Sequence, residues 1–294
     1  MSTKAVANSQ ASHIPSKLSK IAESYQVAYD FSSPTETFVL DKKLNEISSL
    51  AYEPEGNYFI TNDDESGHFY HLRGDDFTIA EEISFSKKGD YEAIEKIGNK
   101  AYVAKSNGNL YVYDYSTTET TTIKSVLSPK NDIEGLCYDK SNEALLLACK
   151  GHPYDEEAGS KKKKYKSIYK YDLRSAELDT EPYMNVHIKE LTRFVELTNA
   201  SAAPSKLKKL KHRVKQFAPS GIAVHPVTGE YYVISARGSL IAIYTKTKEL
   251  VHVELVNNKT IPQPEGITFD IYNNLYISTE GQTFSGKIFK FNVE

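Results

Sequence analysis

Five oxygen-bearing side chains occupy one recurring position of this sequence. They are Glu46, Glu92, Glu134, Ser220 and Glu265. Carboxylates gathered at one axis repel one another and have raised pKa values unless a cation neutralises them. Ca²⁺ accepts about six to eight oxygen ligands in a flexible geometry, whereas Mg²⁺ is stricter and zinc prefers His and Cys. The pattern therefore predicts a Ca²⁺ site. The alternative is a water-filled channel that solvates the glutamates.

A second set of polar side chains is expected beside these oxygens. They stand just before a glycine in each repeat, and close by in sequence: Ser66, Asn107, Lys150, Arg237 and Glu280, with Asp64, Glu65 and Lys105. Lys150 and Arg237 are suited to hold a phosphate or carboxylate. In a catalytic site, Asp64 would position the attacking water as general base, with Glu65 or Glu280 as alternatives. Simple solvation of the basic side chains is the competing interpretation.

The elements that must position these residues form an internal repeat. By subtraction, the residues of the recurring position lie 46, 42, 86 and 45 apart. Each repeat continues with a second apolar run, a glycine, an alternating strand and a fourth strand. Four antiparallel strands with a period of about 45 residues are typical of a β-propeller blade. The sequence therefore predicts an all-β, five-bladed propeller; a β-solenoid or sandwich and a six-bladed ring are the alternatives.

Ring closure and domain boundaries follow from where the repeats end. The last repeat has only three strands before Glu294. We expect Tyr25–Phe31 to supply its fourth strand on the outside of the last blade. Residues 1–23 then form a disordered leader, rich in Ser, Ala, Gln and Lys. Residues 24–294 form a single propeller domain.

Two insertions enlarge the third repeat. Residues 151–166 form a loop that contains Lys161–Lys164. Residues 189–217 have helical periodicity, so a helical insertion is expected between blades three and four. Its second half, Lys206–Lys215, reads as a basic amphipathic helix. Its apolar stripe is expected on the propeller; recognition of an anion, a partner or a membrane surface is the alternative.

Composition and charge exclude several classes of function. The chain has 36 Lys and Arg against 39 Asp and Glu, a net charge of −3, which argues against a nucleic-acid binder. Cys137 and Cys149 are the only cysteines, so no disulfide framework exists. No apolar run is long enough to cross a bilayer. The polar first residues carry no signal peptide, yet they could be the tether left by a removed export signal or lipid anchor.

The ordered motifs resemble the SdiA-regulated (YjiK/CarP-type) propellers. They are Asn45-Glu46-Ile47-Ser48, Gly89-Asp90-Tyr91-Glu92, Ile133-Glu134-Gly135-Leu136, Pro219-Ser220-Gly221-Ile222-Ala223 and Gln263-Pro264-Glu265-Gly266-Ile267. The likeness extends from Tyr25 onward, although Ser49 replaces the usual glycine after the first motif. The resemblance implies an exported or membrane-associated protein without a firmly assigned reaction.

The recurring position is also similar to the Ca²⁺ site of calcium-activated nucleotidases (apyrases), which are five-bladed propellers. Their ligand order by blade, Glu, Glu, Glu, Ser, Glu, matches that of this sequence, and their Asp-Asp-x-x-Gly turn resembles Asp63–Gly67. Shared geometry at one site does not imply a shared reaction.

We therefore expect a monomeric, extracytoplasmic, Ca²⁺-binding propeller whose charged channel mouth faces an anionic small molecule. One alternative is a non-enzymatic interaction protein that uses the basic insertion of blade three. Another is a metal-dependent phosphohydrolase of nucleotidase or phytase type, in which Asp64, Lys150 and Arg237 act on a phosphate group.

Overall fold

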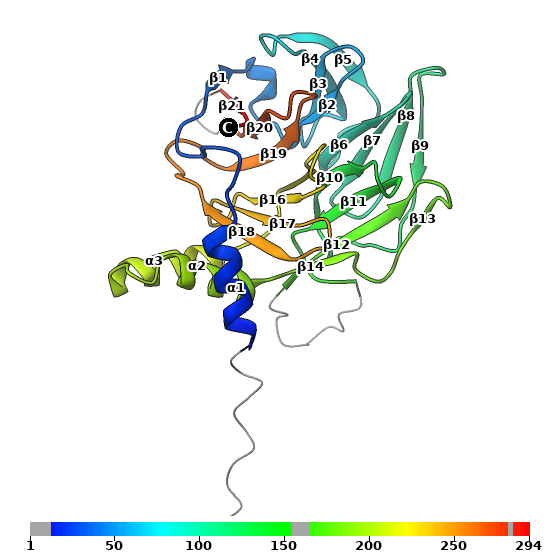
Figure 1. Ribbon diagram of the computed structural model, residues 1–294. Helices are drawn as coiled ribbons and strands as arrows, with labels where there is room; N and C mark the ends of the chain where they lie inside the picture. The colour runs from blue at the N-terminus through cyan, green and yellow to red at the C-terminus, as the bar shows by residue number, and fades with distance from the viewer. Residues whose placement is uncertain (1–12, 155–164, 282–284) are drawn as a thin grey trace, which may run out of the picture.

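Five antiparallel sheets, four of them four-stranded and one five-stranded, surround a common axis in the computed structural model (Figure 1). The structure describes residues 13–154, 165–281 and 285–294, with side chains from residue 18 onward. The protein is an all-β five-bladed propeller, as the repeat predicts. The run Lys161–Lys164 lies outside the described residues.

The blades follow one another along the chain. Blade one is β2 (Ala51–Glu53), β3 (Tyr58–Asn62), β4 (His68–Arg73) and β5 (Ile79–Ser84). Blade two is β6 (Tyr91–Ile97), β7 (Lys100–Lys105), β8 (Leu110–Asp114) and β9 (Glu119–Ile123). Blade four is β15 (Gly221–Val224), β16 (Tyr231–Ser235), β17 (Leu240–Tyr244) and β18 (Leu250–Leu255).

Blade three departs from this pattern at its outer edge. It contains β10 (Ile133–Asp139), β11 (Ala144–Cys149), β12 (Tyr165–Asp172) and β13 (Glu177–Leu178). A further strand, β14 (Met184–His187), pairs with the first half of β12, while β13 pairs with its end. The long third strand thus carries two short partners, and β14 leads directly into the helical insertion.

Blade five closes the ring with a strand from the start of the chain, but not with the predicted one. It consists of β19 (Pro264–Phe269), β20 (Leu275–Thr279), β21 (Lys287–Phe291) and β1 (Glu36–Val39), which pairs with β21. The prediction that Tyr25–Phe31 is the closing strand is wrong. That segment is irregular, and it buries Tyr29 and Phe31 in the core between blades four and five. The Tyr29 hydroxyl donates to the Asn273 carbonyl at 2.8 Å.

Residues 13–24 form helix α1 (His13–Ser24), where the sequence predicted part of a disordered leader. The predicted leader's first part, residues 1–12, lies outside the described residues. Helix α1 lies against α2 (Ile188–Thr198) and β18. A short 3₁₀ helix, η1 (Lys42–Leu44), connects β1 to blade one. Tertiary packing therefore stabilises a segment whose composition does not predict a helix.

The hydrophobic core is divided among the contacts between blades. Five clusters of buried side chains occur, one between each pair of neighbouring blades. The largest joins blades three and four and includes Leu191, Phe194 and Val195 of α2. Helix α3 (Pro204–Val214) packs against α2, adds Val214 to this cluster and places Leu210 partly buried against it, so the predicted helical insertion is confirmed.

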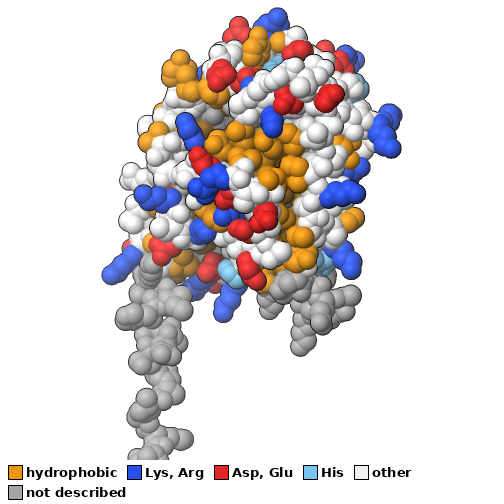
Figure 2. Space-filling view, turned by 90° about the vertical axis from the view of Figure 1, so that its right-hand side faces the viewer, with side chains coloured by type: hydrophobic (Ala, Val, Ile, Leu, Met, Phe, Trp, Pro, Cys, Tyr) orange, Lys and Arg blue, Asp and Glu red, His pale blue; other side chains and the backbone are white. Residues whose placement is uncertain are grey.

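The surface carries both signs of charge. On the face shown in Figure 2, Lys and Arg side chains are interspersed with Asp and Glu, and hydrophobic side chains gather near the middle. Among the described residues, no helix has the length and apolar character needed to span a membrane.

Candidate functional site

Three glutamates of the recurring position lie on β-bulges at the start of the innermost strands. In β6, β10 and β19 the pairing with the second strand shifts by one residue around Glu92, Glu134 and Glu265. Each glutamate is therefore the extra residue, without a partner in the ladder. A bulge bends a strand and redirects a side chain, and bulges are common beside binding sites. The three carboxylates are thus presented at one mouth of the central channel.

Small residues after the recurring position let the innermost strands approach one another. A Cβ at Gly221 would lie 2.5 Å from the Glu265 carbonyl oxygen, and one at Gly266 would lie 2.5 Å from the Leu50 nitrogen. Side chains at both positions would collide with backbone atoms. The Glu-Gly sequence of these repeats therefore reflects the narrow channel as much as any ligand.

In blade one the strand register places Ser48, rather than Glu46, at the recurring position. Ile47 pairs with Asp63 and Ala51 pairs with Ile60, so the one-residue shift falls between Ile47 and Ala51. The alignment of Glu46 with the other glutamates is therefore incorrect by two residues.

Backbone hydrogen bonds confirm the equivalence of Ser48 with Ser220. The Ser48 N–H donates to the Asn62 carbonyl at 3.1 Å, and the Ser220 N–H donates to the Ile234 carbonyl at 3.0 Å. The acidic ring is thus defined by Glu92, Glu134 and Glu265, with serines in blades one and four.

Glu46 still belongs to the same mouth. Its side chain is exposed, and its charge raises the pKa values of Asp64 and Glu280. It therefore lies near these two carboxylates, on the side of the mouth formed by blades one and five.

Burial and mutual repulsion favour the protonated form of the ring carboxyls. Burial, followed by the charges of Glu134 and Asp90, raises the pKa of Glu92 to about 9. Burial raises the pKa of Glu134 to about 7, although Lys150 opposes this shift. The pKa of Glu265 is raised by burial and then by the charges of Glu280 and Glu134. A positive charge beside the ring would therefore stabilise the ionised form of these carboxyls.

Lys150 supplies part of that charge. Its Nζ lies 2.5 Å from Glu134 Oε1. Burial opposes the charge on Lys150, but the hydrogen bond and charge of Glu134 outweigh it, so the pKa of Lys150 is raised. Burial raises the pKa values of Glu92, Glu265 and Glu280, and the charge of Lys150 opposes this rise. It therefore acts as an internal counterion for the mouth.

The Ser220 hydroxyl links two blades. It donates to the Pro264 carbonyl at 2.6 Å and accepts from the Ala236 N–H at 3.1 Å. The side chain is 4% exposed. Its hydrogen bonds thus join blade four to blade five at the channel. Ser220, predicted as a metal ligand, therefore has a structural role.

Asp64 and Asn45, which lie close to Glu46, each have a side-chain oxygen atom without a described hydrogen-bond partner. Asp64 Oδ1 and Asn45 Oδ1 are buried and accept no hydrogen bond within the described parts of the chain. Burial, followed by the charges of Glu46 and Glu65, raises the pKa of Asp64 to about 6. Unsatisfied buried acceptors attract a cation or an ordered water.

The donor set at this mouth has the chemistry that Ca²⁺ prefers, namely carboxylate and amide oxygens without His or Cys. Over residues 13–154, 165–281 and 285–294, no group of three or more Asp, Glu, His or Cys side chains is arranged to surround one metal ion. The ammonium of Lys150 already contacts one ring carboxylate. A bound ion would therefore compete with Lys150 for Glu134.

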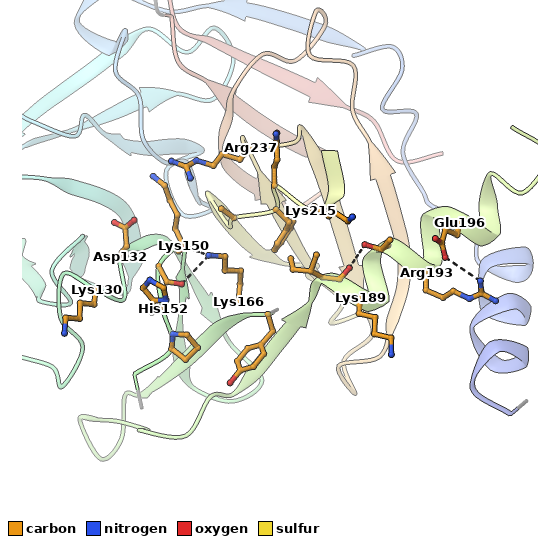
Figure 3. Close-up of a pocket in the computed structure, with 18 of the residues that line it drawn as sticks. Lys130, Asp132, Lys150, His152, Lys166, Lys189, Arg193, Glu196, Lys215 and Arg237 are labelled. Atoms are coloured by element: carbon orange, nitrogen blue, oxygen red, sulfur yellow. Dashed lines mark hydrogen bonds and ion pairs between the residues drawn. The ribbon is translucent and has the colours of Figure 1, made fainter. Parts of the chain in front are cut away.

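A basic cavity of about 1740 Å³ adjoins the ring. It lies between blades three and four and the helical insertion. Its lining includes two acidic residues, Asp132 and Glu196, and seven Lys or Arg residues: Lys130, Lys150, Lys166, Lys189, Arg193, Lys215 and Arg237. Figure 3 shows Lys150, Lys166 and Arg237 on the propeller side, with Lys189 and Arg193 on the side of α2. Lys150 therefore belongs to both the ring and the cavity.

Some of the basic side chains that line the cavity form hydrogen bonds or ion pairs within the protein, whereas Arg237 is exposed to solvent. The Lys166 Nζ donates to the Lys150 carbonyl at 2.5 Å, and Arg193 pairs with Glu196. Arg237 is exposed and forms no ion pair with a described carboxylate. Lys150 and Arg237 thus line the same cavity.

The other residues expected near the mouth have local structural roles. Ser66 donates to the Asp63 carboxylate, Asn107 accepts from the Asn109 N–H, and Lys105 lies 5.4 Å from the ring centre of Tyr91. The first two contacts fix turns between the second and third strands, and the third joins the end of β7 to the start of β6.

Sequence reasoning missed Lys166 and Leu18. Lys166 lies in the part of β12 that extends beyond the predicted strand, and Leu18 lies in the segment predicted to be disordered. Neither residue occupies a position that recurs in the other repeats. Lys166 lies in a segment peculiar to blade three, and Leu18 lies in the N-terminal segment before the repeats.

The fold and the charged mouth define a five-bladed β-propeller with a candidate binding site at the end of its channel. The chain belongs to the SdiA-regulated family, whose model matches residues 23–201 and 182–286. No curated protein matches the sequence significantly.

Solved structures share the fold at low sequence identity. A luciferin-regenerating enzyme is 10% identical, with 88% of this chain and 95% of that chain covered and a TM-score of 0.50. A virginiamycin B lyase from Staphylococcus aureus is 14% identical, with 87% and 69% covered and a TM-score of 0.47. A nidogen/laminin complex is 12% identical, with 81% and 73% covered and a TM-score of 0.48. At these identities the likeness is one of fold.

Proposed function

We propose that this protein binds an anionic small molecule in the basic cavity and Ca²⁺ at the adjoining acidic ring. The observation that carries the proposal is the lining of the cavity, in which seven Lys or Arg residues outnumber two acidic ones. The whole chain has a net charge of −3, so this concentration of positive charge is local. Charge-assisted hydrogen bonds from Lys and Arg to phosphate or carboxylate are about twice as strong as neutral ones.

Two features support Ca²⁺ at the ring. The carboxyls of Glu92, Glu134 and Glu265 have raised pKa values, so a cation would lower their energy. All available donors are oxygen atoms. To bind Ca²⁺, these three carboxylates would have to draw together around the ion, and Glu134 would have to release Lys150. Glu46 would be a further ligand from the segment in front of the ring. Ser220 would serve as a link between blades.

The direct test is calorimetric titration of the purified chain, with pyrophosphate and with Ca²⁺ as separate probes at constant ionic strength. We expect one pyrophosphate site, weakened about tenfold or more by Arg237→Ala. Lys246→Ala is the matched control, because Lys246 is exposed and lies outside the cavity lining. Pyrophosphate binding that survives Arg237→Ala and Lys150→Ala unchanged would refute the cavity as the anion site. Absence of heat with millimolar Ca²⁺ would refute the ring as a metal site.

A second candidate function is metal-dependent hydrolysis of a phosphoester or phosphoanhydride, and Asp64 favours it. A carboxyl with an unpartnered buried oxygen and a pKa of about 6 is suited to activate water near neutral pH. The screen covers nucleotides, phytate and simple phosphate esters in the presence of Ca²⁺. Asp64→Asn should lower any turnover by about 100-fold while Ca²⁺ affinity stays nearly constant. Turnover that is insensitive to Asp64→Asn would exclude this role.

A further inference from the structure

The basic cavity also has an apolar part of its lining, which we call the apolar wall. Leu18 of α1, Ile188 at the start of α2 and Phe217 after α3 all line it. Leu18 and Ile188 are only partly buried, and they pack on the edge of the core between blades three and four. The apolar wall is thus a continuation of the core that remains open to the cavity.

The two walls come from different parts of the molecule. Lys150, Lys166 and Arg237 project from the propeller, whereas Leu18 and Ile188 belong to helices that lie side by side (Figures 1 and 3). Helix α1 is necessary for the apolar wall, because it brings Leu18 to the cavity. A small inorganic anion would contact the cations and leave this wall in water.

The volume also exceeds what a single phosphate needs. Cavities for drug-sized ligands span about 300–1,000 Å³, and this one is about 1740 Å³. A ligand that fills more of it must have an organic body in addition to its charged group.

We infer that the cavity takes an amphiphilic anion, a monomeric molecule with a phosphate or carboxylate head and an apolar chain. The inference rests on the proposed function, since it specifies the anion bound beside Lys150 and Arg237. The head lies against the propeller cations, and the chain lies along Leu18 and Ile188. The occupant is a single molecule rather than a membrane surface, because the cations line a concave cavity between blades and helices.

The test is a series of ethyl, butyl, hexyl and octyl phosphate, titrated as monomers into the full chain. Burial of each methylene group should tighten binding by roughly three- to fourfold until the apolar wall is covered. Leu18→Ala and Ile188→Ala should each weaken octyl phosphate by about five- to tenfold and leave ethyl phosphate unchanged. Val227→Ala is the control, since Val227 is 73% exposed and lies outside the cavity lining.

Each outcome separates this inference from the proposed function. If ethyl phosphate binds and the affinity does not change along the series, the amphiphile is refuted and the anion site stands. If octyl glucoside, which is uncharged, binds as tightly as octyl phosphate, the charged head has no role and the inference fails. Binding to phosphatidylglycerol vesicles without binding to monomeric octyl phosphate would also overturn it, in favour of a membrane surface.

Discussion

The acidic ring and the basic cavity meet at Lys150 but arise in different ways. The ring comes from a position that the repeat copies around the axis, with glutamates on bulges in blades two, three and five. The cavity occurs on one side only, and the insertion and α1 supply much of its lining. The comparison suggests that the repeat builds a general electrostatic centre, whereas the additions to blade three and the N-terminus determine which ligand is bound.

The largest expected effect of a substitution comes from reversing the charge of one cavity residue, which distinguishes the cavity from the ring. Arg237→Glu should weaken pyrophosphate about 100-fold, because a cation beside the phosphate becomes an anion. Ca²⁺ affinity should change less than twofold. Calorimetric titration of both probes, with Lys246→Glu as control, measures the difference. Equal losses for the two variants would mean that overall charge, rather than the cavity, attracts the anion.

Lys150 is the residue that both regions share, so its removal should act on them in opposite directions. Lys150→Met should weaken pyrophosphate about tenfold, since one cavity cation is lost. The same change should tighten Ca²⁺ about tenfold at pH 8, because the ion no longer competes with the ammonium for Glu134. Weakening of both ligands would contradict a counterion role for Lys150 at the ring.

The raised pKa values of the ring give it a pH dependence that the cavity cations lack. Ionised Glu92 and Glu134 are required for Ca²⁺, so affinity should rise by roughly three orders of magnitude from pH 6 to 9 with release of protons. Without Ca²⁺, the folded state binds more protons than the unfolded state between about pH 4.5 and 9. Its stability should therefore fall as pH rises through this range.

Thermal unfolding at pH 5, 7 and 9 with and without Ca²⁺ measures the pH effect, and buffers of different ionisation enthalpy report the protons released. Glu92→Gln should flatten the decline in the absence of Ca²⁺. A melting temperature that rises steadily to pH 9 without Ca²⁺ would show that the ring carboxyls ionise freely.

The smallest effect on binding is expected at Ser220. Ser220→Ala removes a donor and an acceptor from a buried link between blades, which should cost about 1–2 kcal/mol of unfolding free energy. Ca²⁺ affinity should change less than twofold. Denaturant unfolding and Ca²⁺ titration test the two expectations together. A Ca²⁺ affinity lowered tenfold would restore Ser220 to the ligand set.

Much of the architecture follows from the sequence alone, for a physical reason. A blade cannot bury its apolar faces by itself, so the alternating strands must recur with each blade, and the period becomes visible. The run Ala144–Cys149 is both predicted and observed as one strand. The helical insertion is likewise evident, because its apolar spacing at residues 191, 194 and 195 matches one face of a helix.

Other features depend on contacts between residues far apart in the sequence. Glu36–Val39 and Tyr25–Phe31 are both short and partly apolar, and only pairing with β21 selects the first as the closing strand. The two-residue displacement of blade one, by contrast, could be read from the sequence, because Ile47-Ser48-Ser49-Leu50 aligns with Ile133-Glu134-Gly135-Leu136. The hydrogen-bond register shows that this alignment, and not the one through Glu46, is correct.

The sequence by itself determined the five blades, the position of the glutamates in blades two, three and five, and the helical nature of the insertion. Local periodicity and residue type are sufficient for these features. Only the tertiary structure decided that Lys150 bonds to Glu134, that Ser220 joins two blades and that α1 brings Leu18 to the basic cavity. Those relations depend on how the ring closes and on how the helices pack against it, which no local pattern specifies.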